Sequence, residues 1–190
     1  MTSDPEIQLS LSENFASDDY NAARELFREF GTVDANTYIR MSAQLLDPII
    51  IITLVSTAFA CGFFGKMGED AYEAIKSRIA SFLAQRRHPT APTTVELNFP
   101  YEGMNVKPQF DARSIDLTNA ALSGLHEIPP TLGEQSSSNT WPRVDEVYFQ
   151  FDEETRTWQL YWALSSRPFV KYRYSHDNRT WEEQPGRIDW

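Results

Sequence analysis

The chain has 190 residues, of which 41% are hydrophobic and 13% aromatic, enough apolar side chains to exclude a wholly disordered protein. Its formal net charge of −10, from 17 basic and 27 acidic residues, argues against a general nucleic-acid binder, which needs a basic surface. A single cysteine, Cys61, excludes an internal disulfide, and the first residues lack the basic and apolar segments of a secretory signal. We therefore expect a cytoplasmic protein.

The N-terminal residues predict a strand followed by a helix. Ile7, Leu9 and Leu11 alternate with polar residues, which is the period of a half-buried strand. Ser17 can cap a helix whose first turn is acidic, and Gly31 can end that helix.

The most distinctive segment is an uncharged run from Pro48 to Phe64, bounded by Asp47 and Lys66. A helix of this length spans about 25 Å, slightly less than the hydrocarbon core of a bilayer at about 30 Å. Two interpretations stay open: a fully apolar helix buried inside a soluble domain, or a single membrane span over about 48–65. A span would cross the inner membrane with the C-terminus in the cytoplasm, because basic residues follow it. The apolar residues of this predicted helix are Ile49, Ile50, Ile51, Ile52, Leu54, Val55, Phe59, Phe63 and Phe64.

The middle of the chain predicts a helix, a hairpin and a second helix. Residues 69–84 have the apolar period of an amphipathic helix, and alternation over 95–99 and 104–110 predicts two strands around a turn. Pro108 removes a backbone donor, which indicates an edge strand. Asp116 can cap a further helix, and Pro129–Pro130 is expected to end it.

The polar segment 129–140 predicts a linker between a domain over 1–128 and a C-terminal module over 141–190. All five tryptophans lie in that module. It contains a short repeat, because Phe149–Phe151 and Arg156–Trp158 are matched by Tyr172–Tyr174 and Arg179–Trp181, each numbered 23 higher. Each copy predicts two strands joined by a polar turn, and together they predict a β-meander of about four strands.

The sequence contains no motif typical of catalysis or cofactor binding. Gly65–Lys66 resembles part of a phosphate-binding loop but lacks the preceding glycine and the following hydroxyl residue. The histidines, His88, His126 and His176, do not have the spacing of metal ligands. We therefore expect no cofactor, no metal site and no enzyme activity.

The aromatic residues of the C-terminal module either cover the sheet of the main domain or form a contact surface. Tryptophan, tyrosine and arginine dominate the hot spots of protein interfaces. The residues we expect to contact another protein are Trp158, Trp162, Tyr172, Tyr174, Arg179 and Trp181.

Three segments follow one another along the chain: the apolar run Ile49–Phe64, the segment Ile79–Arg87 with its basic end, and the strand Thr94–Leu97. Their order resembles that of the effector-associated constant component family of small bacterial proteins. The resemblance covers 7–128 and implies a non-catalytic adaptor domain that recruits or regulates an effector in a prokaryotic conflict or defence system. The aromatic C-terminal module and the strength of the apolar run depart from the family pattern.

The sequence as a whole predicts an α+β protein, with a small sheet packed by three or four helices, one of them fully apolar, and an aromatic C-terminal β-meander. The expected function is that of an adaptor or regulatory protein that binds another protein and no nucleic acid. Two alternatives stay open. One is a single-pass membrane protein with a cytoplasmic C-terminal sensing domain, and the other is an acidic immunity protein against a basic toxin.

Overall fold

The computed structural model describes residues 7–12, 15, 17–28, 33–38, 49–54, 69–85, 93–136 and 141–184. Its elements in chain order are β1 (Ile7–Ser12), α1 (Ser17–Phe27), β2 (Val33–Tyr38), β3 (Ile49–Leu54), α3 (Glu69–Gln85), β4 (Thr93–Tyr101), β5 (Met104–Ala112), α4 (Ile115–Gly124), the 3₁₀ turn η3 (Leu125–Glu127), α5 (Ile128–Ser136), β6 (Glu146–Asp152), β7 (Thr157–Ser166), β8 (Phe169–Ser175) and β9 (Thr180–Gln184).

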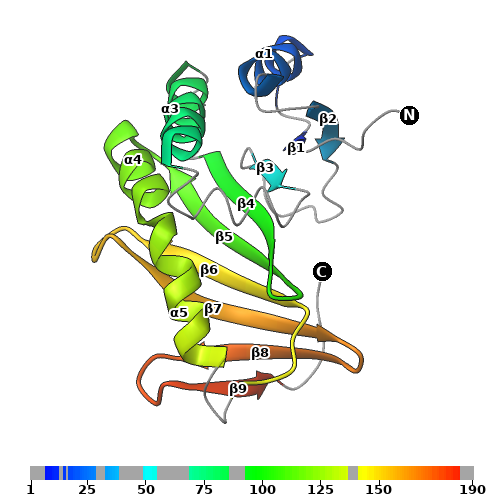
Figure 1. Cartoon of the computed structure of the whole chain (residues 1–190), viewed down its shortest axis with the longest axis vertical. Coiled ribbons are helices and arrows are strands. Elements are labelled where there is room, and N and C mark those ends of the chain that lie inside the picture. Colours follow the sequence, from blue (N-terminus) through cyan, green and yellow to red (C-terminus); the bar gives the residue numbers. More distant parts are fainter. Residues whose placement is uncertain are drawn as a thin grey trace.

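The described strands form one mixed sheet in the order β2-β1-β3-β4-β5-β6-β7-β8-β9 (Figure 1). The pairs β1/β2, β3/β4 and β5/β6 are parallel, and the other neighbours are antiparallel. The predicted fold class, a small sheet packed by helices, is therefore wrong, because a nine-stranded sheet dominates the described residues. Two features account for the difference: the apolar run supplies a strand, and the C-terminal strands extend the same sheet through the β5/β6 pair.

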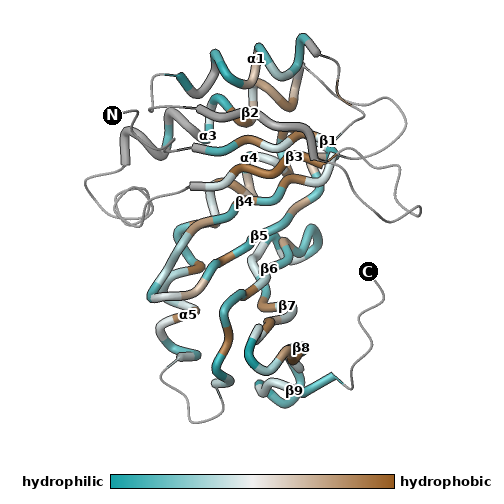
Figure 2. Tube along the Cα trace, turned by 90° about the vertical axis from the view of Figure 1, so that its right-hand side faces the viewer, coloured by the Kyte–Doolittle hydropathy of each residue, from teal (hydrophilic) through white to brown (hydrophobic). Residues whose placement is uncertain are grey.

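The helix predicted over 48–64 is wrong for Ile49–Leu54, which form β3 between β1 and β4. Ile50 and Ile52 are 3% and 2% exposed, and β3 is one of the most hydrophobic stretches of the trace (Figure 2). Its four consecutive isoleucines are β-branched, which restricts χ1 and favours the extended chain. The other residues of the predicted helix, Val55, Phe59, Phe63 and Phe64, lie outside the described residues. Among the helices that the structure describes, none has the length and apolar character needed to cross a membrane.

Pro108 lies in the interior of the sheet, so the prediction that it marks an edge strand is wrong. β5 is flanked by β4 and β6. The β4/β5 pairing runs as far as Glu96↔Gln109 and resumes at Phe99↔Val106. The missing N–H of Pro108 falls in this gap, where the ladder does not require a donor.

The α4 and α5 helices begin differently from the prediction. Ser114, rather than Asp116, caps α4, because its Oγ accepts a hydrogen bond from the Leu117 N–H at 3.1 Å. Pro129–Pro130 does not end a helix but lies in the first turn of α5, where backbone N–H groups have no intrahelical acceptor. The first part of the predicted linker is thus helical, and β6 then joins the sheet of the preceding residues.

The described helices cover one face of the sheet (Figure 1). Alternate residues of β4 and β5 are buried, and paired residues such as Val95 and Phe110 share this covered face. α3 contributes Ile79 and Phe82, 3% and 4% exposed, which confirms the amphipathic helix predicted over 69–84. We call the opposite side, on which no described helix packs, the helix-free face.

Candidate functional site

The C-terminal strands form two hairpins with the same construction, which confirms the predicted repeat. Phe151 lies opposite Trp158 in β6/β7, and Tyr174 lies opposite Trp181 in β8/β9. The two ring pairs have centroid distances of 5.3 and 5.2 Å and interplanar angles of 62° and 64°. Each turn ends on an arginine with positive φ, 57° at Arg156 and 50° at Arg179. Equal sequence spacing has therefore produced equal backbone and ring geometry.

A β-bulge in β7 separates two tryptophans that a regular strand would place on one face. Tyr148 pairs with Trp162, but the next residue, Phe149, pairs with Leu160, so Tyr161 is an extra residue in β7. Trp158 points into the core, is 8% exposed, and donates its indole N–H to the Ala121 carbonyl oxygen at 2.9 Å. Trp162 lies on the helix-free face, beyond the bulge.

Two aromatic rings and two lysines form a row across four adjacent strands of the helix-free face. The Tyr148 and Trp162 rings stack, with centroids 3.5 Å apart and planes 12° from parallel. The Lys107 ammonium on β5 lies 5.1 Å from the Tyr148 ring centroid, and the Lys171 ammonium on β8 lies 4.8 Å from that of Trp162. The Trp162 indole therefore stacks on an aromatic ring and lies within cation–π distance of a lysine ammonium.

The two cationic ends of this row differ in how they are balanced. Lys107 is 19% exposed and pairs with Glu146 at 2.9 Å, and the Tyr148 hydroxyl donates to the same carboxylate at 2.7 Å. On β8, Lys171 and Arg173 are exposed, and within the described residues neither has a carboxylate at salt-bridge distance. The β8 strand therefore presents two cations without an ion pair, and Glu182 on β9 lies opposite Arg173 in the register.

Exposed large apolar side chains lie on either side of these cations along β7 and β8. Large hydrophobic residues that are exposed in the described part of the chain are Tyr161 at 47%, Phe169 at 51% and Ile115 at 48%. Tyr161 lies in the β7 bulge, and Phe169 shares the helix-free face with Lys171, because β8 alternates from Arg173, which pairs with Trp162. We call this surface, formed by Tyr161, Trp162, Phe169, Lys171 and Arg173, the β7–β8 patch.

The structure distributes the six predicted contact residues over different parts of the molecule. Trp158 and Tyr174 are each 8% exposed and belong to the core, and Tyr172 packs partly buried against it. Trp181 also packs against the core and contacts Trp141 edge to face at 5.5 Å.

The remaining two predicted contact residues are accessible. Arg179 is exposed in the β8–β9 turn, and Trp162 lies in the β7–β8 patch. Sequence reasoning missed Tyr148, Tyr161, Phe169, Lys171 and Arg173. The alternation of Phe169, Lys171 and Arg173 with other residues was the available signal, because a period of two places all three on one face.

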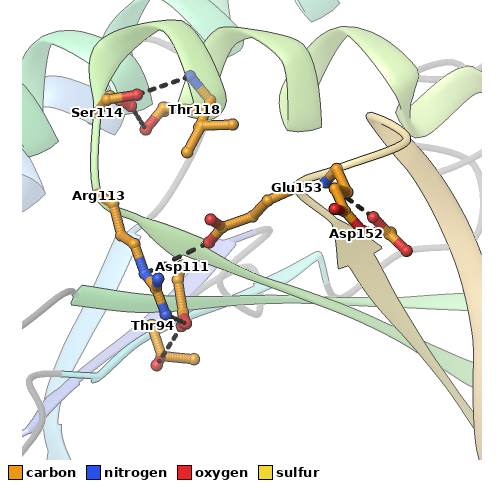
Figure 3. A network of polar contacts seen from close by, with 9 residues as sticks. Thr94, Asp111, Arg113, Ser114, Thr118, Asp152 and Glu153 are labelled. Carbon is orange, nitrogen blue, oxygen red and sulfur yellow. Dashed lines mark hydrogen bonds and ion pairs between the residues drawn. The ribbon is translucent and has the colours of Figure 1, made fainter.

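A polar network lies where β5 meets the β6–β7 turn (Figure 3). Arg113 reaches Asp111 and Glu153, each at 3.4 Å, and Thr94 donates its hydroxyl to Asp111 at 3.0 Å. Asp152 accepts hydrogen bonds from backbone N–H groups of the turn, that of Thr155 having the largest effect, and these bonds lower its pKa. Together with the Arg156–Asp116 ion pair, these contacts fix the turn against β5 and the start of α4, so we regard this network as structural.

The described residues show no group of three or more histidine, cysteine, aspartate or glutamate side chains arranged to hold a metal ion. The chain matches no family model, no curated protein and no solved structure. The resemblance to the effector-associated constant component family therefore stays a prediction.

Proposed function

We propose that this protein is a non-catalytic adaptor or regulatory protein that binds another protein through the β7–β8 patch. The observation that carries the proposal is the exposure of two aromatic residues, Tyr161 next to Trp162 in β7 at 47% and Phe169 at the start of β8 at 51%. Aromatic residues and arginine are enriched at protein interaction sites, and the surface combines exposed examples of both. The predicted defence-system role, in which the partner is a separate effector, is consistent with this surface.

A second candidate function is an immunity protein that neutralises a basic toxin. The net charge of −10 favours it, because opposite charges speed encounter and stabilise the complex. The two candidates differ in the expected charge of the partner, so they can be separated experimentally.

Affinity capture from the native host with matched variants tests the proposal. The full chain with Tyr161→Ser and Phe169→Ser is compared with the chain carrying Ile115→Ser, since Ile115 is exposed to a similar extent but begins α4. We expect the patch variant to lose the captured protein and the α4 variant to retain it. Thermal melting of both variants establishes that they are folded. Retention by a folded patch variant would contradict the proposal.

A further inference from the structure

The β7–β8 patch has a local charge opposite to that of the whole molecule. The chain carries a formal charge of −10, yet the exposed charged residues in the patch are Lys171 and Arg173. The nearest carboxylate in the register is Glu182 on β9, opposite Arg173, and it is not within salt-bridge distance. Lys171 and Arg173, counted together with Glu182, leave a local net positive charge on an acidic protein, which favours a partner segment of opposite charge.

The aromatic residues of the patch do not form a bare stacking platform. One face of Trp162 is covered by the Tyr148 ring, and the Lys171 ammonium lies 4.8 Å from the Trp162 ring centroid. This arrangement differs from the open aromatic faces on which bases stack in single-strand nucleic-acid sites.

The spacing of the patch residues matches an extended polypeptide. Phe169, Lys171 and Arg173 occupy alternate positions of β8, and alternate side chains of a strand are about 7 Å apart. An extended segment presents its own alternate side chains at the same interval. A partner with one apolar and two acidic residues at every second position would match all three.

We infer that the β7–β8 patch binds an extended, acidic segment of the partner protein. Its carboxylates pair with Lys171 and Arg173, and its apolar side chain packs on Phe169. This inference rests on the proposed function and specifies the chemistry of the partner.

Fluorescence anisotropy of a labelled synthetic peptide tests the inference. The probe is a short peptide with valine, glutamate and glutamate at successive alternate positions and serine between them. We expect it to bind the full chain and to lose at least about tenfold in affinity in Lys171→Glu/Arg173→Glu. Arg24→Glu/Arg28→Glu is the matched control, because it changes the net charge equally at two exposed positions, one in α1 and one directly after it. This control should leave binding unchanged, and raised salt should weaken it.

Four results would overturn the inference. These are failure of the acidic peptide to bind, equal loss of affinity in both double variants, tighter binding of the same peptide with lysine in place of glutamate, and binding of single-stranded oligothymidylate that depends on Lys171 and Arg173. The third result would favour the immunity protein.

The inference and the proposed function can fail separately. If the native partner is still lost in the Tyr161→Ser/Phe169→Ser variant while the acidic peptide does not bind, only the inference that the partner segment is acidic is wrong. If that variant keeps its partner, the proposed function itself is wrong.

Discussion

Tyr148 and Trp162 stack face to face at 3.5 Å because the bulge in β7 brings them directly opposite each other. This contact connects the buried centre of the sheet to the β7–β8 patch, since Tyr148 is only 9% exposed. The stack therefore restricts the orientation of the Trp162 side chain.

The stack should contribute measurably to stability. In a double-mutant cycle with Tyr148→Leu and Trp162→Leu, we expect a coupling energy of about 0.5–1.5 kcal/mol beyond the loss of buried area. Urea denaturation of the four proteins measures it. A coupling smaller than about 0.3 kcal/mol would mean that the two rings do not stack in solution.

Two glycines in neighbouring helices should respond oppositely to alanine. A Cβ at Gly124 would lie 3.2 Å from Trp158 Cδ1, and the indole is anchored at Ala121, so Gly124→Ala should destabilise by about 1 kcal/mol. A Cβ at Gly133 in α5 meets nothing within 4 Å, so Gly133→Ala should stabilise by about 0.4–1 kcal/mol. Thermal or urea unfolding distinguishes the two. Equal shifts would indicate that Trp158 is not fixed against α4.

The start of α4 offers a direct comparison between the observed and the predicted cap. Ser114→Ala removes the acceptor for the Leu117 N–H and should lower the free energy of unfolding by about 1 kcal/mol. The Asp116 side chain is 71% exposed and pairs with exposed Arg156. Asp116→Ala should therefore change the free energy of unfolding by less than about 0.5 kcal/mol. The reverse order of effects in chemical denaturation would place the cap at Asp116.

Stability should depend on pH through Asp145. Its Oδ2 accepts hydrogen bonds from the Ser166 hydroxyl and from the Ser166 N–H, and these bonds hold the pKa of Asp145 below its ordinary value. A pKa lowered by folding stabilises the protein above the unfolded value of about 4, and this contribution disappears as pH falls through the folded value.

We therefore expect Asp145→Asn to be less stable than the natural chain at neutral pH, with a difference that shrinks as pH falls below about 4. Urea midpoints across a pH series measure this, and Arg24→Gln on α1 serves as a charge-change control on a different element. A difference that stays constant or grows in acid would contradict the assignment.

Local patterns predicted many elements correctly. Alternation at Ile7, Leu9 and Leu11 indicated β1, and the period over 69–84 indicated α3. The same kind of pattern could not decide between helix and strand for the apolar run, because a strand in the sheet interior and a buried helix both appear as continuous hydrophobic sequence. The consecutive isoleucines of β3 were the signal that favoured a strand.

The candidate site was less predictable than the fold. Trp158 and Trp162 are both even-numbered, so a regular strand would place them on one face, and only the bulge at Tyr161 separates them. The position of a bulge depends on pairing with β6 and is not encoded in the β7 pattern alone. The exposure of Phe169 likewise depends on which face the helices cover, and that became visible only with the complete sheet.

The central claim is that the β7–β8 patch contacts another protein, and site-specific photo-crosslinking in the native host tests it most directly. A benzoylphenylalanine is placed at position 169 in one variant and at position 115 in the other, two sites that are 51% and 48% exposed. We predict that a discrete protein adduct forms from position 169 and not from position 115. An adduct from position 115 alone, or from neither position, would contradict the account.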